Sequence, residues 1–504
     1  MAPTSIRQCM HDLTFYVVLI IAISTLGPLQ YGFHLAELNA PEDVITCKKK
    51  SVSSNHRLTA TSTQNASLPE CIPMQAVEFA LVSSIFTLGG LVGALSGGPV
   101  STAYGRLMAM RITTIFFVIG SVLEALAPGI SMLIIGRLLS GVGAGAALVV
   151  VPIYISEVAP PQERGIFGVM TQISINTGIL TTQVLGYYLS HGSSWRMILA
   201  FGSGLGLLQS ITLFFVPETP AWTAANKDPQ NALRVLQRIR GKYHDVGEET
   251  ATWDVKIPQD DGETEGLLSQ PGRLSREGSS SSKGHGKPTR NIGIFEVVRD
   301  PLYRPAILAV VGVMCAQQLC GINSVMMYSV SLLSDLFPSS AALLTIFISI
   351  VNFIVTVACA PLPDSLGRKK TILISVTGMG CSSLALAFSM LFGVKVLSAI
   401  AVASYVASFA AGLGPIPFML ASELVGQEAR GATQSWALGA NWIATFVVAQ
   451  FFPIINKALG GRGWVYFIFA GMALLSALFI AWFVPETKGK KDADEVWGRT
   501  RRVD

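Results

Sequence analysis

A histidine and a glutamate, His34 and Glu37, stand three residues apart in the first long apolar stretch of the chain. This spacing places both side chains on one face of a helix. An imidazole with the ordinary pKa of about 6.5 changes charge between compartments of different pH, and a neighbouring carboxylate favours its charged form. Because a charge in a membrane helix costs about 2.5–3.5 kcal/mol, the pair predicts a role in carrying or sensing a proton. The alternative is that His34 makes hydrogen bonds in the lining of a path, with Glu37 at its mouth.

Side-chain amides inside apolar stretches form a second set of candidate residues. Gln317, Gln318 and Asn323 share one stretch, which we expect to be broken around Gly321, whereas Gln172 and Asn352 stand in two others. An amide both donates and accepts hydrogen bonds, and amides in membrane helices turn inward to find partners. These residues therefore suit a polar binding site, the alternative being that they hold helices together. The sequence shows no nucleophile with a neighbouring base and no metal-ligand cluster, so we expect no enzymatic activity, no metal and no cofactor.

The elements that must position these residues are membrane helices. The chain has 504 residues, of which 51% are hydrophobic and only 13% charged, against about 25% charged in soluble domains. Apolar stretches long enough to cross a bilayer recur from end to end. The fold class is therefore an all-α membrane protein, and the first stretch is too long for a signal peptide. We predict twelve transmembrane helices, at 13–36, 76–98, 108–126, 130–152, 167–189, 196–216, 304–331, 338–361, 370–391, 396–420, 433–455 and 463–484.

The distribution of basic residues predicts the orientation. Of 36 Lys and Arg residues, 27 fall on the side of the two termini, eight on the other, and Arg137 inside a span, so both termini are expected to be cytoplasmic. The loop at 42–75 is then exoplasmic, where Asn65 opens a glycosylation tripeptide. Cys47 and Cys71 share this loop and could pair in an oxidising compartment, a question the sequence leaves open. The net charge of +5 follows from this asymmetry and does not indicate a nucleic-acid partner.

The chain repeats itself at a displacement of 262–268 residues. "SEVAPPQERG" from Ser156 returns as "SELVGQEARG" from Ser422, and "VPETP" from Val216 returns as "VPETK" from Val484. Such a repeat predicts two six-helix halves. We expect an N-terminal bundle at 1–220, a cytoplasmic linker at 221–303, a C-terminal bundle at 304–487 and a cytoplasmic tail at 488–504. The linker should contain one short amphipathic helix, followed by a polar segment that we expect to be disordered.

Several motifs carry a resemblance to a known family. They include "GRLLSGVGAGAALVVVPIYISEVAPPQERG" at 136–165, "QQLCGINSVMMYS" at 317–329, "PDSLGRKK" at 363–370 and "GPIPFMLASEL" at 414–424. With them the chain resembles the sugar porter family of the major facilitator superfamily, which includes fungal hexose transporters. Its "LQYGFHLAELNAP" at 29–41 is similar to the first helix of animal facilitative glucose transporters. The resemblance implies two six-helix pseudo-repeats and transport of a monosaccharide, most simply a hexose such as glucose, by alternating access.

The resemblance assigns sugar binding to the five amides, and Asn352 has the family's spacing to Gly367. Phe418 takes the place of a tryptophan common in the family, which keeps an apolar face for the sugar and loses an N–H donor. Thr445 replaces a common asparagine. His34 stands where proton-coupled members carry an aspartate and facilitative members an asparagine, so proton symport and uniport both remain open.

A charged set near the cytoplasmic ends of the helices is expected to form a gate. In the family, such charges hold the two halves together in one state and separate in the other, so they bias a two-state equilibrium. The alternative is that they only anchor the topology. Thr102 stands in the first half where Asp364 stands in the second, so we expect the two gates to be unequal. The set comprises Arg106, Glu157 and Arg164 in the first half, and Asp364, Arg368, Glu423 and Arg430 in the second.

"ETEGLL" at 263–268 fits an acidic dileucine sorting signal. The protein could therefore lie in the plasma membrane or in a vacuolar or lysosomal membrane, and the sequence favours neither. The expected partners are a monosaccharide, protons if transport is coupled, and membrane lipids. Rival interpretations are a transporter-like sugar sensor, disfavoured by the short tail after "VPETKG", and a carrier of another small polar solute. The sequence does not define the sugar, the direction of transport or the oligomeric state.

Overall fold

The computed structural model describes residues 14–48, 68–160, 164–226, 228–241, 250, 294–334, 340–426, 429–461, 463–490 and 493–498. Asn65 and the dileucine motif lie outside these residues, so both remain predictions. The described residues form helices and turns, without a strand among them. In the first half the helices are α2 (Phe15–Ser24), α3 (Leu26–Ala36), α4 (Glu42–Ile45), α5 (Ala76–Tyr104), α6 (Arg106–Ala125), α7 (Ile130–Val158), α8 (Arg164–Leu189) and α9 (Trp195–Thr212).

Two short helices follow α9, and the second half begins near residue 294. The short helices are α10 (Pro220–Asn226) and α11 (Pro229–Arg240). Those of the second half are α13 (Ile294–Arg299), α14 (Arg304–Leu319), α15 (Ile322–Ser334), α16 (Ala341–Cys359), α17 (Leu362–Leu366), α18 (Arg368–Leu391), α19 (Lys395–Ser408), the π-helical turn η2 (Phe409–Leu413), α20 (Ile416–Glu423), α21 (Arg430–Ala458), α22 (Val465–Phe483) and α23 (Ala493–Val496).

The predicted spans are confirmed as helices. Ten helical segments of the described residues are long and apolar enough to cross a membrane, and they cover ten of the twelve predicted spans. The remaining two spans correspond to α8 and α9. Helix α8 is less apolar because it carries polar residues such as Gln172, Asn176 and Gln183.

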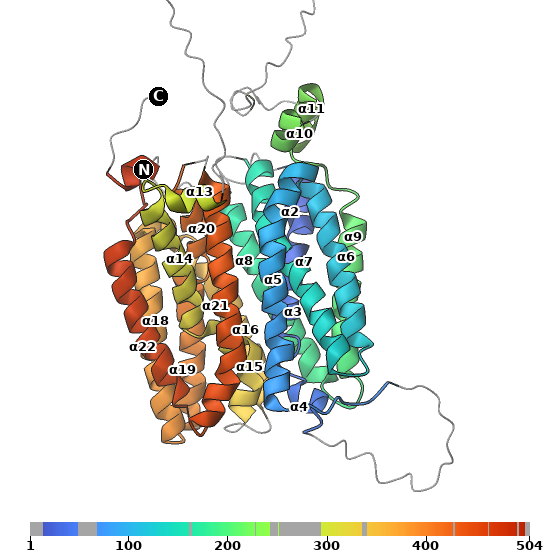
Figure 1. Ribbon diagram of the computed structural model, residues 1–504, viewed down its shortest axis with the longest axis vertical. Helices are drawn as coiled ribbons and strands as arrows, with labels where there is room; N and C mark the ends of the chain where they lie inside the picture. The colour runs from blue at the N-terminus through green and yellow to red at the C-terminus, as the bar shows by residue number, and fades with distance from the viewer. Residues whose placement is uncertain are drawn as a thin grey trace, which may run out of the picture.

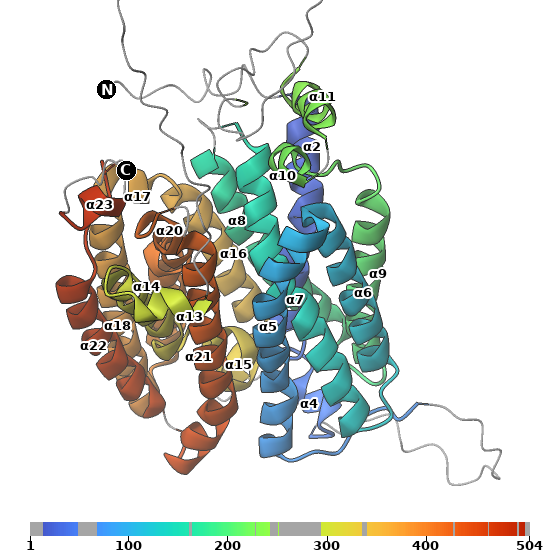
Figure 2. The ribbon, with the colours of Figure 1, turned by 45° about the horizontal axis from the view of Figure 1, so that its top comes forward.

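The helices form two groups that lie side by side (Figure 1), with α2–α9 in blue to green and α13–α23 in yellow to red. Within the first group, α7 packs on α5 and α6, and α3 packs on α8; within the second, α18 packs on α19 and α22, and α14 on α21. The groups meet where α5 contacts α21 and where α8 contacts α16. Helix α4 lies at one end of the molecule, here called the disulfide end, and α10, α11 and α13 lie at the opposite, terminal end (Figure 1), where Figure 2 also shows α23.

Glycines in α7 allow neighbouring helices to approach closely. A Cβ at Gly141 would overlap the carbonyl oxygen of Phe86 in α5, and one at Gly145 would overlap that of Gly90. Gly143 faces the other way, with the Thr113 carbonyl oxygen of α6 at 3.1 Å from the Cβ position. Small residues at these positions therefore let α7 pack between α5 and α6.

Three of the membrane segments are broken, and the breaks release backbone groups inside the protein. The chain turns at Thr25 between α2 and α3, and at Gly321, with φ +97°, between α14 and α15. The π-helical turn η2 and Gly414 separate α19 from α20. Backbone that leaves the helical pattern at membrane depth must lie within the protein or line a cavity. The break at Gly321 was expected from the sequence, and it separates the amides of one candidate site.

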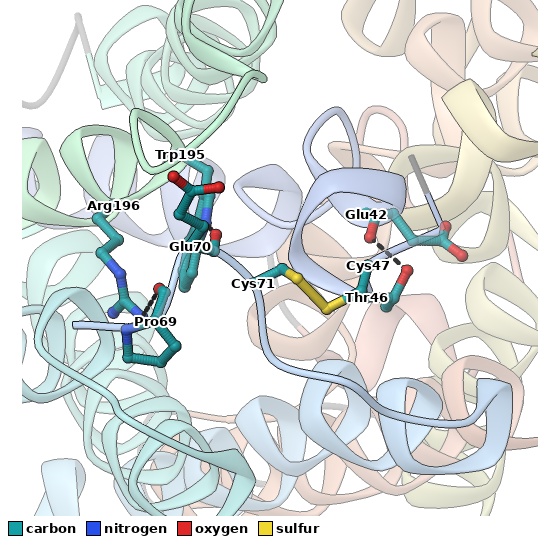
Figure 3. Close-up of a disulfide and its surroundings, with 8 residues drawn as sticks. All are labelled: Glu42, Thr46, Cys47, Pro69, Glu70, Cys71, Trp195 and Arg196. Carbon is teal, nitrogen blue, oxygen red and sulfur yellow. Dashed lines mark hydrogen bonds between the residues drawn. A yellow bond between two sulfur atoms is a disulfide. The ribbon is translucent and has the colours of Figure 1, made fainter. Parts of the chain in front are cut away.

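A disulfide between Cys47 and Cys71 closes the loop at the disulfide end (Figure 3), which answers the question the sequence left open. The segment beside Cys71 is fixed to α9. The indole Nε1 of Trp195 donates to the Glu70 carbonyl at 2.7 Å, and Arg196 Nη2 donates to the Pro69 carbonyl at 2.9 Å. The disulfide end is therefore held against the first half.

Candidate functional site

The first cluster of amides joins α14, α15 and α21. Gln318 Nε2 donates to Gln317 Oε1 at 3.2 Å and to Asn441 Oδ1 at 3.3 Å. Asn323 Nδ2 donates to Gln318 Oε1 at 2.7 Å, and Asn441 Nδ2 to Gln317 Oε1 at 2.7 Å. Gln317 Nε2 in turn donates to the Leu413 carbonyl at 2.7 Å, a group freed by the break at η2. All four amides are buried.

The second cluster of amides crosses between the two halves. Gln172 Nε2 in α8 donates to Asn176 Oδ1 at 3.1 Å. Asn176 and Asn352 of α16 exchange hydrogen bonds at 3.3 and 3.5 Å, and Asn176 Nδ2 also donates to Thr356 Oγ1 at 2.7 Å. The two amides that the sequence placed in different halves, Gln172 and Asn352, are thus brought together through a residue that the sequence analysis did not select.

His34 and Glu37 lie inside the first half, away from lipid. His34 Nδ1 is 2.9 Å from Glu37 Oε2, and Glu37 Oε1 accepts a hydrogen bond from Arg137 Nη1 of α7 at 2.5 Å. The imidazole stacks on Phe117, with ring centroids 5.5 Å apart, and its Nε2 is 3.4 Å from Ser121 Oγ. Glu37 is 1% exposed. The described conformation therefore places Glu37 in a buried ion pair and not at an open mouth.

Two matching sets of charges occupy the terminal end. In the first half, the Arg106 guanidinium pairs with Glu157 at 2.7 Å, and in the second, Arg368 pairs with Glu423 at 3.1 Å. Glu218 accepts hydrogen bonds from the backbone N–H groups of Arg106 and Leu107. Glu486 accepts one from the backbone N–H of Arg368, at 2.8 Å. Each carboxylate thus caps the positive end of a helix dipole, and the two halves repeat the same arrangement.

The two sets differ where the sequence predicted a difference. Arg368 has an additional partner in Asp364 at 2.9 Å, although Asp364 is 67% exposed. Thr102, in the equivalent position, makes a hydrogen bond to the Gly98 carbonyl within its own helix instead. The pairs Arg106–Glu157, Arg368–Glu423 and Arg368–Asp364 each join residues of one half. Arg430 is exposed at the start of α21, and the side chain of Arg164 lies outside the described part of the chain.

Asn39 connects the two halves at the disulfide end. Its Nδ2 donates to the Met326 carbonyl at 3.0 Å and to Ser329 Oγ at 2.8 Å, both in α15. Its Oδ1 accepts from the backbone N–H of Val330 at 3.1 Å. Asn39 is buried. The halves are therefore latched together at this end, whereas Arg106 and Arg368 at the other end pair with carboxylates of their own half.

Comparison with known proteins decides the family. The family model described as "Sugar (and other) transporter" matches residues 19–496 of the chain. The chain belongs to the sugar transporter family. It is accordingly a membrane protein that transports sugar, in a family of carriers and not of enzymes, and its helices have the major facilitator fold.

Similar proteins come from yeast, human and bacteria. A probable metabolite transport protein of Saccharomyces cerevisiae is 32% identical over 97% of each chain. Vacuolar protein sorting-associated protein 73 of the same yeast is 31% identical over 96% of each. Human facilitated glucose transporter member 3 is 30% identical over 95% of this chain and 91% of its own. The xylose transporter XylE of E. coli, in a partially occluded inward-open conformation, superposes with a TM-score of 0.72 at 23% identity, covering 95% of this chain and all of that one.

In this sugar transporter, three polar residues of the two amide clusters were not selected from the sequence as binding residues. They are Asn176, Asn441 and Thr356. Asn176 follows Gln172 by four residues, which puts both on one helix face, so the sequence held a signal for it. Phe418 is partly buried and packs at the edge of the apolar core, and Trp442 is buried against Tyr31 and Phe86. The structure thus places Trp442 in the interface between the halves.

Proposed function

We propose that this sugar transporter carries a hexose such as glucose by alternating access, with the two amide clusters as its binding site. The observation that supports this most strongly is the pairing of Asn176 with Asn352 across the two halves. A hexose presents hydroxyl groups that donate and accept, and these can replace the long amide–amide hydrogen bonds at 3.3–3.5 Å. Gln317, Gln318 and Asn323 supply further groups of the same kind, and Phe418 supplies an apolar face.

The relatives support a sugar of this class. The human relative is named as a facilitated glucose transporter and the E. coli structure as a xylose transporter. Both sugars carry a ring of hydroxyl groups, which is the chemistry that the amides suit. We therefore propose a monosaccharide substrate and place hexose before other small polar solutes.

We further propose that the disulfide end is exoplasmic and that both termini are cytoplasmic. The excess of basic residues on the side of the termini supports this orientation, as does a disulfide, which forms in oxidising compartments. The Asn39 latch then closes the exoplasmic side, so the described conformation faces the cytoplasm. The plasma membrane and the vacuolar membrane both fit this orientation; one yeast relative is named for vacuolar protein sorting.

Sugar counterflow in proteoliposomes tests the binding site. Vesicles loaded with unlabelled glucose should accumulate labelled glucose, and fructose, galactose, xylose and disaccharides should compete to different degrees. Gln318→Ala removes a residue with three amide partners, so it should lower the apparent sugar affinity at least tenfold. Asn226→Ala is the matched control, because its amide donates only to the Trp222 carbonyl within α10. Equal affinity for glucose in both variants would contradict the proposed site.

A specific observation favours a second function, proton symport. His34 and Glu37 are two titratable side chains in buried contact, with Arg137 beside them, and such side chains mark proton pathways in membranes. We propose that transport is coupled to protons through this pair. An inwardly directed proton gradient should then drive sugar above its outside concentration in the vesicles. Simple equilibration of the sugar would leave uniport as the mechanism.

A further inference from the structure

A second glutamate, Glu124 of α6, faces the His34–Glu37 pair. One nitrogen of His34, one oxygen of Glu37 and one oxygen of Glu124 lie within 4.8 Å of one another. Glu124 is 0% exposed, and its Oε1 accepts a hydrogen bond from Ser140 Oγ at 2.7 Å. Its Oε2 is buried without a partner. The cluster of His34, Glu37, Glu124 and Arg137 thus joins three helices, α3, α6 and α7.

The charges of this cluster do not balance. Two carboxyl groups, Glu37 and Glu124, face one guanidinium, that of Arg137, and a neutral imidazole would leave a net charge of −1. No charged residue of α5 compensates this, because Phe86 is the contact there. On α9, Arg196 donates to the carbonyls of Ala125, Ala127 and Pro69 and not to a carboxyl of the cluster.

A buried carboxylate without a countercharge costs several kcal/mol. One proton bound by the cluster removes the deficit. The surroundings of the two carboxyl groups show which one takes this proton. Glu37 Oε1 accepts from Arg137 Nη1 at 2.5 Å, and its Oε2 lies 2.9 Å from His34 Nδ1, which donates to it in the tautomer protonated at that nitrogen. Both contacts stabilise the ionised form of Glu37. Glu124 has a single neutral donor and one oxygen with none.

We propose that Glu124 holds the exchangeable proton of the transport cycle, on Oε2. This inference rests on the proposed proton coupling and names the residue that carries it. When the proton leaves Glu124, the new carboxylate needs a positive partner. Arg137 Nε is also buried without a hydrogen bond, so the guanidinium has a donor to offer. Loss of the proton therefore draws Arg137 away from Glu37 and toward Glu124.

A chain of contacts connects Arg137 to the sugar site. Its guanidinium lies 4.5 Å above the ring of Phe86. Phe86 contacts the ring of Trp442 in the second half, with centroids 6.3 Å apart. Trp442 follows Asn441, whose amide donates to Gln317 Oε1 at 2.7 Å. A movement of Arg137 thus changes the packing between the halves directly beside an amide cluster.

The test is Glu124→Gln in proteoliposomes, which fixes this side chain in a neutral form of the same shape. Counterflow exchanges sugar without net proton movement, so the variant should keep it within about twofold of the wild-type rate. Accumulation driven by a pH gradient should disappear. One pH unit supports up to about a tenfold accumulation at one proton per sugar, and the variant should reach a ratio of one. Glu78→Gln, an exposed acid of α5 outside the cluster, is the matched control.

Infrared spectroscopy of the purified protein supplies an independent measurement. A protonated carboxyl group absorbs at a C=O frequency that a carboxylate lacks, and this band should be present in the wild type and absent in Glu124→Gln. If that variant does not fold, Glu124→Asp should shift the band. A wild-type protein that only equilibrates sugar would refute the proton coupling, and with it the proposal that a proton on Glu124 takes part in the transport cycle. Accumulation that persists in Glu124→Gln, or a band unchanged by the substitution, would overturn the assignment to Glu124 while leaving the coupling intact.

Discussion

Replacing Asn39 by alanine should release the latch at the disulfide end and move the protein toward the conformation open on that side. Asn39 makes three hydrogen bonds to α15, to the Met326 carbonyl, Ser329 Oγ and the Val330 N–H. All three exist only while the halves touch at this end. Asn39→Ala removes these bonds from the closed conformation and leaves the open conformation, in which they are not made, unchanged.

The size of the effect follows from the number of bonds. A buried hydrogen bond contributes about 1 kcal/mol net, so three of them favour the closed end by about 3 kcal/mol. Since 1.4 kcal/mol is a factor of ten, Asn39→Ala should shift the equilibrium on the order of a hundredfold. In the wild type the conformation closed at the disulfide end should dominate, and in the variant the closed and the open conformations should both be populated.

Hydrogen–deuterium exchange measures this shift without labels. Peptides covering α15 should exchange faster in Asn39→Ala, and peptides at the terminal end, such as those of α20, should exchange more slowly as that end closes. Asn226→Ala removes an asparagine hydrogen bond that does not cross between the halves, so it should change neither region. Unchanged exchange in α15, in a variant that melts at the wild-type temperature, would refute the latch.

Two further predictions concern stability in detergent. Partial burial raises the pKa of the Glu218 carboxyl above its usual range, against the opposing effect of the backbone N–H groups that donate to it; the folded protein therefore holds this proton more tightly than the unfolded chain. The stability that this group contributes is present below its pKa in the unfolded chain, about 4.3, and is lost as the pH rises through its pKa in the folded protein. Over that pH range the melting temperature should therefore fall less in Glu218→Gln than in the wild type. Gly145→Ala should lower the melting temperature because its Cβ overlaps the Gly90 carbonyl, whereas Gly98→Ala, with no atom within 4 Å of its Cβ, should not; equal melting temperatures would show that α5 and α7 can separate at little cost.

The sequence defined the membrane helices and the repeated motifs because both are local properties. Apolar length predicts a span, and the gate residues recur at one displacement. The contacts between distant residues could not be read in this way. Glu37 was found because it stands three residues from His34, but Glu124 lies on another helix, and nothing in its own surroundings in the chain connects it to the pair. The break at Gly321 was predicted, whereas the use of the freed Leu413 carbonyl by Gln317 depends on packing between helices.

The gate charges show the same limit. Their types and repeated spacing predicted a set, and the structure shows how the members are distributed. Arg106 binds Glu157 and Arg368 binds Glu423, while Glu218 and Glu486 cap helices. The same arginines and glutamates could pair within one half or between the two halves. The sequence does not distinguish these two patterns, and the structure does. The sequence showed that the first half has Thr102 where the second half has Asp364. Arg106 therefore has one carboxylate partner fewer than Arg368.

The contacts between the halves differ along their interface, and this difference suits a carrier. At the disulfide end Asn39 bonds to backbone groups and a hydroxyl, which water can satisfy after separation. Between α8 and α16, Asn176 and Asn352 exchange amide hydrogen bonds that the sugar replaces in the mechanism we propose. At the terminal end Arg106 and Arg368 already have carboxylate partners, so opening that end leaves neither charge alone. The two conformations of the proposed carrier can then differ by only a few kcal/mol, the condition under which a bound sugar or proton can shift the population from one to the other.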